Sequence, residues 1–152
     1  MIIDSLNEFA DATSVAAAAG TTLVGNVIDL GATPQDLGNG EPMYLIITVG
    51  TGIITAGAAG TIAFSLVSDA AAAIATNGTA TTHISTGTFV TGATAIDGTV
   101  FVGAMPTGAG KVYERYLGVL STVATTTTSA GTINAFLTRD PSAWKAYADG
   151  TN

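Results

Sequence analysis

The sequence contains no cysteine, and this absence excludes a disulfide framework and any metal site built from thiolates. It contains a single histidine, His83. Nucleophilic chemistry of the Ser-His or Cys-His kind would therefore depend on that one residue. The residues beside it, Thr82, Ile84 and Ser85, include no carboxylate. We therefore predict a polar side chain on a strand face, and we expect no metal and no other cofactor.

Charge is equally scarce. Only 10% of the residues are charged, against about a quarter in ordinary soluble domains, and the formal net charge is −7. The four basic residues are Lys111, Arg115, Arg139 and Lys145, scattered along the C-terminal third. Phosphate contacts need clustered basic side chains, so we expect no nucleic-acid partner. Anionic membranes are disfavoured for the same reason.

The uncharged stretch at residues 42–68 has the hydropathy of a membrane span. However, Gly50, Gly52, Gly57 and Gly60 interrupt it, with threonines between them. This pattern favours a strand, a glycine-rich loop and a second strand. We therefore predict no membrane segment here.

What the sequence has in abundance is Thr, Ala and Gly between short apolar runs. Thr is β-branched and favours strands, and alternation is clearest at Ile62, Phe64 and Leu66. We predict strands at residues 23–30, 43–49, 61–67, 81–85, 99–105, 112–123 and 132–138. The expected fold is an all-β antiparallel jelly-roll sandwich of about eight strands in a single domain.

Evidence for helix is thin. Residues 69–75 have an Asp N-cap at Asp69 followed by good helix formers, and the pattern stops at Asn77 and Gly78. Residues 14–20 are similar and also fit an arm or a turn. We divide the chain into residues 1–20, an N-terminal arm or an edge strand, and residues 21–152, the jelly-roll domain.

Both ends of the chain carry apolar side chains that could reach beyond the sandwich. The N-terminal segment holds Ile2, Ile3, Leu6 and Phe9 amid acidic residues, and the C-terminal segment holds Trp144 and Tyr147. Amphipathic aromatic residues are favoured at interfaces. We predict these six residues as protein-interface residues, although an edge strand and a tail folded over its own sandwich remain alternatives.

No motif predicts catalysis. Residues 106–112 look like a phosphate loop, but Met105 and Val112 occupy the positions that require a glycine and a hydroxyl residue. Glu114 and Arg115 are adjacent in a predicted strand, so they should point to opposite faces and meet separate partners. We expect no enzyme and no catalytic residue.

Four segments resemble, in the same order, the jelly-roll capsid cement (decoration) proteins of tailed double-stranded DNA phages. They are MIID at the start, VIDLGATPQDLGNGEPMYLIITV (27–49), YERYLGVLSTVAT (113–125) and INAFLTRDPSAWKAYADG (133–150). The resemblance implies a virion protein, made in the host cytoplasm, on the outer capsid surface. It would bridge neighbouring major capsid protein subunits as a symmetric homo-oligomer, with a dimer favoured over a trimer.

Two other functions stay open. One is a jelly-roll module that binds a glycan or a receptor on a virion surface, which should show aromatic side chains clustered on loops or on a sheet face. The other is an enzyme that uses carboxylates on the same fold, which should show a pocket with acids of perturbed pKa.

Overall fold

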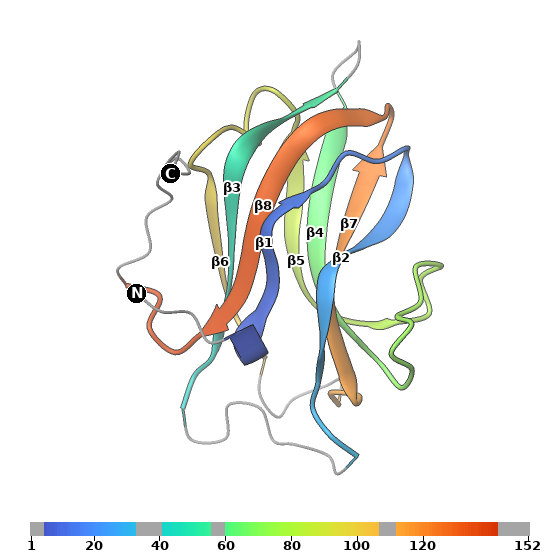
Figure 1. Cartoon of the computed structure of the whole chain (residues 1–152), viewed down its shortest axis with the longest axis vertical. Helices are drawn as coiled ribbons and strands as arrows, with labels where there is room; N and C mark the ends of the chain where they lie inside the picture. The colour runs from blue at the N-terminus through green and yellow to red at the C-terminus, as the bar shows by residue number, and fades with distance from the viewer. Residues whose placement is uncertain (1–4, 33–40, 56–59, 107–111, 143–152) are drawn as a thin grey trace.

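The computed structural model describes residues 5–32, 41–55, 60–106 and 112–142, which form two antiparallel four-stranded sheets packed face to face (Figure 1). A short 3-10 turn, η1 (Ser5–Asn7), precedes the first strand. The strands are β1 (Glu8–Ser14), β2 (Gly20–Asp29), β3 (Tyr44–Thr55), β4 (Thr61–Asp69), β5 (Thr81–Val90), β6 (Val100–Ala104), β7 (Tyr116–Ala124) and β8 (Thr128–Thr138).

The order of the strands identifies the fold as jelly-roll-like. One sheet has the order β1-β8-β3-β6 and the other β2-β7-β4-β5. Strands β1 and β8, β2 and β7, β3 and β6, and β4 and β5 each pair antiparallel. Such nested pairs arise when one long antiparallel ribbon wraps into two sheets, which is the jelly-roll arrangement. The prediction of an all-β antiparallel sandwich is confirmed.

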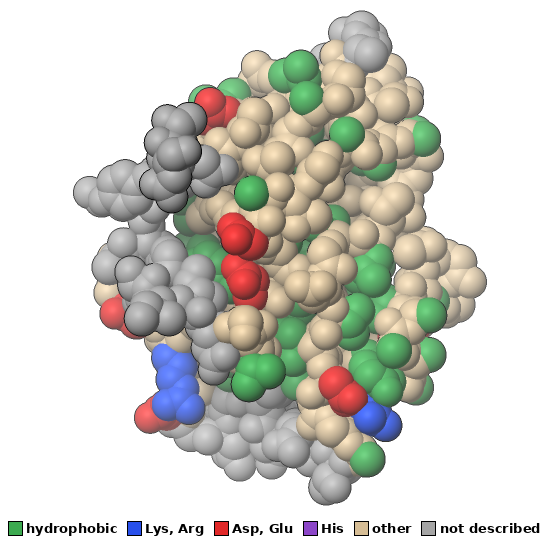
Figure 2. Space-filling view, viewed as in Figure 1, with side chains coloured by type: hydrophobic (Ala, Val, Ile, Leu, Met, Phe, Trp, Pro, Cys, Tyr) green, Lys and Arg blue, Asp and Glu red, His purple; other side chains and the backbone are tan. Residues whose placement is uncertain are grey.

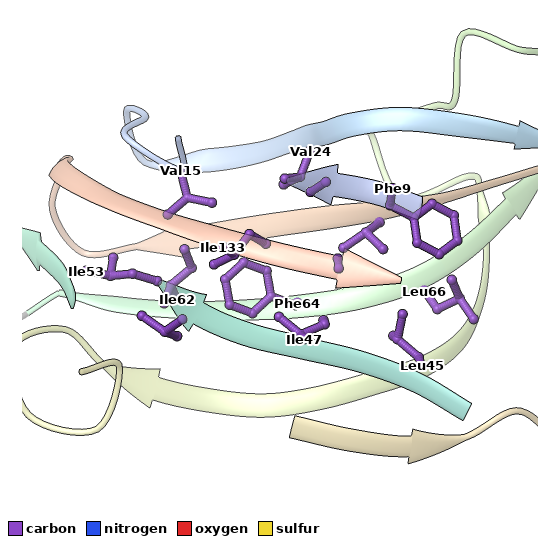
Figure 3. Close-up of a cluster of buried hydrophobic side chains, with 14 of the residues drawn as sticks. Phe9, Val15, Val24, Leu45, Ile47, Ile53, Ile62, Phe64, Leu66 and Ile133 are labelled. Carbon is purple, nitrogen blue, oxygen red and sulfur yellow. The ribbon is translucent and has the colours of Figure 1, made fainter. Parts of the chain in front are cut away.

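Strand alternation builds the core between the sheets. Ile62, Phe64 and Leu66 of β4 are buried, as the sequence pattern predicts, and they face Leu45 and Ile47 of β3 (Figure 3). Each fully buried side chain of this size contributes about 1.5–3 kcal/mol relative to an exposed one. The uncharged stretch at 42–68 therefore supplies strands, and no helix among the described residues has the length and apolarity of a membrane span.

The first described residues complete the sandwich. Strand β1 lies at the edge of its sheet beside β8, and Phe9 is fully buried in the core (Figure 3). The prediction of Phe9 as an interface residue is therefore wrong in this fold, because the side chain is used inside the chain's own core. Gly25 makes the close approach possible. It has a φ of +65°, and a Cβ there would overlap the carbonyl oxygen of Phe9.

The loop between β4 and β5 lies against the outer side of the β2-β7-β4-β5 sheet. Its residue Ile74 is buried with Val67 and Leu120 in a small second apolar cluster. A Cβ at Gly118 would lie 2.5 Å from the Cδ1 atom of Ile74, so a larger residue there would force the Ile74 side chain to move.

In the same loop residues 70–73 form bends and Asp69 is the last residue of β4, so the weak helical pattern at residues 69–75 does not become a helix. Asp69 does bond the backbone, but its carboxylate accepts from the amides of Ala71 (3.0 Å) and Ala75 (2.9 Å) across the loop. Burial of Ile74 against the sheet supplies a tertiary contact that outweighs the helix propensity of a few alanines.

Candidate functional site

The antiparallel topology gives the molecule two ends of different chemistry. The connections β1–β2, β3–β4, β5–β6 and β7–β8 lie at the upper end in Figure 1. The connections β2–β3, β4–β5 and β6–β7 lie at the opposite, lower end. We use "upper end" and "lower end" for these two regions.

At the lower end a buried serine joins three parts of the chain. The Ser68 Oγ atom lies 2.8 Å from Nε2 of His83 and accepts a hydrogen bond from the backbone amide of Glu114 at 3.1 Å. The Glu114 carboxylate in turn accepts from the hydroxyl of Thr81 at 2.8 Å. Ser68 therefore connects the end of β4 to the start of β5 and to the segment before β7.

An aromatic side chain covers the histidine. The rings of His83 and Tyr113 stack with centroids 4.0 Å apart and planes inclined by 22°. Burial raises the pKa of Tyr113 to about 12, so its hydroxyl stays protonated near neutral pH and donates to the carbonyl of Pro106 at 3.1 Å.

The contact between Ser68 and His83 has the donor–acceptor distance of a serine nucleophile and its base. A nucleophile must be reachable by a substrate, and Ser68 has no exposed surface. The nearby carboxylate of Glu114 is bound by Thr81. We therefore interpret the cluster as a structural contact that holds these segments of the chain together. In the described part of the chain, no group of three or more His, Cys, Asp or Glu residues could hold a metal.

Two ion pairs also belong to the lower end, and Figure 2 shows each arginine beside an acidic side chain. Arg115 binds Asp29 through two parallel hydrogen bonds of 2.8 Å from its Nε and Nη2 atoms. The Nη1 atom of Arg139 lies 2.6 Å from Oε2 of Glu41. Both described basic residues are thus neutralised by partners within the chain.

Glu114 and Arg115 meet different partners, as predicted, but both residues precede β7, so the strand expected from residue 112 begins only at Tyr116. The hydrogen bonds from Arg115, and then that from the amide of Gly31, lower the pKa of Asp29 to about 2. Both side chains are nearly half exposed, so the pair orients the end of β2 and contributes little to stability.

At the upper end three large apolar side chains are exposed. Ile54 and Ile96 are each 50% exposed, and Val90 is 37% exposed. They come from the end of β3, the end of β5 and the connection that follows β5. We call these three residues the apolar tip.

Hydrogen bonds fix the backbone that carries the apolar tip. The amide of Gly92 donates to the carbonyl of Ile53, and the amide of Ile53 donates to the carbonyl of Ala95, both at 2.8 Å. The carboxylate of Asp97 accepts from the amide of Gly52, and Ala95 is buried in the core. The apolar side chains therefore stand on an ordered support.

The structure places the sequence-predicted interface residues in different environments. Leu6 is 75% exposed at the lower end, whereas Phe9 is buried. Ile2, Ile3, Trp144 and Tyr147 lie outside the described residues. These residues and Leu6 stay predictions.

Sequence reasoning missed the apolar tip, because Ile54 follows the buried Ile53 in one apolar run and only the strand register separates them. It also missed Ser68, which is fifteen residues from His83 and meets it only across the two strands.

Comparison with known proteins identifies the family of this chain. A search of curated proteins gives no match to this chain. Residues 9–137, which run from the second residue of β1 to the next-to-last residue of β8, match the Bbp16 family. The match covers most of the chain, and the protein therefore belongs to the Bbp16 family.

Proposed function

We propose that this protein is a non-enzymatic structural component of a phage virion. It binds the outer face of the capsid and cements neighbouring major capsid protein subunits, and it acts as a symmetric homo-oligomer, with a dimer favoured. Membership of the Bbp16 family, which links the chain to phage proteins, supports the proposal. The jelly-roll-like fold and the order of the four segments that resemble cement proteins also support it.

The observation that carries the proposal is the apolar tip on its ordered backbone. A preordered surface loses little conformational entropy when it binds, and Ile54, Val90 and Ile96 can bury apolar area against a partner. Several weak contacts of this kind add up through effective concentration when an oligomer bridges several subunits. We therefore assign capsid contact to the upper end.

The test uses phage capsids assembled without this protein. Purified full-length chain should co-sediment with them to saturation and raise the temperature at which they release DNA. The double variant Ile54→Asp with Ile96→Asp should bind at least about tenfold more weakly, because a carboxylate would have to be buried in the contact. Val112→Asp is the matched control, since Val112 is 78% exposed but lies in the connection between β6 and β7 at the lower end.

If the wild-type chain does not bind capsids, the proposal fails. If the Val112→Asp variant loses binding and the double variant keeps it, the capsid contact belongs to the lower end instead. Binding to a glycan array without binding to capsids would favour the receptor-binding module. Among the described aromatic side chains Phe9, Phe64 and Phe136 are buried, which leaves fewer of them for sugar stacking.

A further inference from the structure

The four edge strands differ in how well they could pair with another chain. Strand β1 shifts register against β8 at two places, β2 shifts once against β7, and β5 shifts twice against β4. Such irregularities twist an edge away from further pairing. Strand β6 pairs with β3 from Tyr44 opposite Ala104 to Thr48 opposite Val100 without a shift. It is therefore the regular edge of the sandwich.

The hydrogen bonds around β6 show which backbone groups face outward. The amide of Val49 donates to the carbonyl of Thr99, and the amide of Met105 donates to the carbonyl of Met43, both at 2.9 Å. Odd-numbered residues thus bond β3. In an antiparallel pair the alternate residues direct their N–H and C=O groups away from the partner. In the described part of the chain, those groups of Val100, Val102 and Ala104 face the open edge.

The exposed small side chains and the absence of charge at the β6 edge also favour pairing with another chain. Val102 is 45% exposed, and Ala104 is exposed as well. The segment 98–106 contains no charged residue. By contrast, β1 carries Glu8 and Asp11, and β2 ends at Asp29.

The difference in charge between β1 and β6 favours a second copy of the chain as the partner of β6. Two copies of a chain with a net charge of −7 repel each other, and like charges that face each other across strands destabilise pairing. An acidic edge such as β1 therefore opposes self-association, whereas β6 brings no acid against its own copy. A twofold axis also makes the contact isologous, with the same residues on both sides.

We propose that β6 pairs antiparallel with β6 of a second copy, so that the two β1-β8-β3-β6 sheets become continuous. With the twofold axis at Val102, this residue lies opposite itself and exchanges two hydrogen bonds with its copy. Val100 then lies opposite Ala104 of the second copy, and both are small enough to avoid a clash. The pairing supplies the homo-oligomer of the proposed function and in that respect rests on it.

The test needs no capsid, so its failure is distinct from failure of the proposed function. Sedimentation of the full-length chain over a concentration series should show a dimer. Val102→Lys, which places two cations opposite each other, should give a folded monomer whose thermal unfolding no longer depends on protein concentration. Val112→Lys should remain a dimer. A monomeric wild-type chain, or a dimer that survives Val102→Lys, overturns the proposal.

Because the chain has no cysteine, disulfide trapping can test the register. Residues opposite each other in a hydrogen-bonded pair have Cα atoms about 5.5 Å apart, within the span of a disulfide. Val102→Cys should therefore form a covalent dimer under mild oxidation. Ala104→Cys should not, since its two copies would lie about 13 Å apart along the strands. Equal trapping of both variants would overturn the proposed register.

Discussion

At the two ends of the sandwich, different groups hold the connections and strand ends together. Buried hydroxyls join separate segments at both ends, Ser68 at the lower end and Thr91 and Thr128 at the upper end. The ion pairs of Asp29 and Glu41 with the two described arginines belong to the lower end. The exposed surface of the upper end instead carries Ile54, Val90 and Ile96.

The two ends therefore differ in what their side chains can do. Polar contacts at the lower end stabilise the fold, whereas apolar side chains at the upper end are available to a partner. At the lower end, polar groups are engaged with each other, so few of them remain to bind a partner. At the upper end, Thr91 and Thr128 make buried hydrogen bonds, and Ile54, Val90 and Ile96 are exposed. A sandwich of low charge can therefore hold an apolar surface in a fixed position without a disulfide.

Thr128→Val should have the largest effect on stability. The Thr128 hydroxyl donates to the carbonyl of Val15 at 2.7 Å and accepts from the amide of Ala17 at 2.9 Å, and the side chain is buried. Valine has the same shape but leaves these groups without a partner, at a cost of about 3 kcal/mol. Chemical denaturation measures the loss. The exposed neighbour Thr127→Val is the control and should change the free energy of unfolding by less than about 0.5 kcal/mol. Equal effects of the two variants would show that the Thr128 hydroxyl does not stabilise the upper end.

Ser68→Ala should have the next largest effect. It removes the contact to His83 and the acceptor of the Glu114 amide at the lower end, and we expect a loss of about 1–2 kcal/mol in the free energy of unfolding. The control Ser85→Ala changes an exposed serine of β5. The imidazole NMR signals of His83 should shift in Ser68→Ala only. Unchanged signals would mean that Ser68 does not hold the ring.

Arg115→Gln should have the smallest effect, because its ion pair is exposed. The pKa of Asp29 should rise from about 2 toward its usual value of 3.8. A lowered pKa in the folded state contributes stability above the unfolded-state pKa, and this contribution is lost as the pH falls from about 4 to about 2. The variant should lack that pH dependence. Carboxyl NMR titration measures the shift, Arg139→Gln should leave Asp29 unchanged, and an unaltered pKa in Arg115→Gln would contradict the assigned cause.

Local sequence patterns were sufficient to predict much of the strand structure of the two sheets. The alternation at Ile62, Phe64 and Leu66 predicts a strand with its correct inward face, and residues 99–105 enclose the observed β6. Prediction failed where a contact distant in sequence decides the outcome. Strand β3 continues past Gly50 and Gly52 to Thr55 because β8 pairs along its whole length.

Two segments have sequence patterns too weak to define their structure. The segment that contains β1 has no clear alternation, since its register against β8 shifts twice. Residues 69–75 have the composition of a helix, but a helix of about two turns is marginal by itself. Burial of Ile74 above Gly118 is the stronger interaction.

The sequence by itself determined the class of the protein. Abundant Thr and Gly, alternating apolar residues and scarce charge specify short strands and a surface of few ions, because these preferences act locally. Only the tertiary structure decided which side chains meet across the sheets. It brought Ser68 to His83, buried Phe9, exposed the apolar tip and left β6 as the regular edge. Those outcomes depend on strand order and register, in which a shift of one residue turns every side chain to the other face.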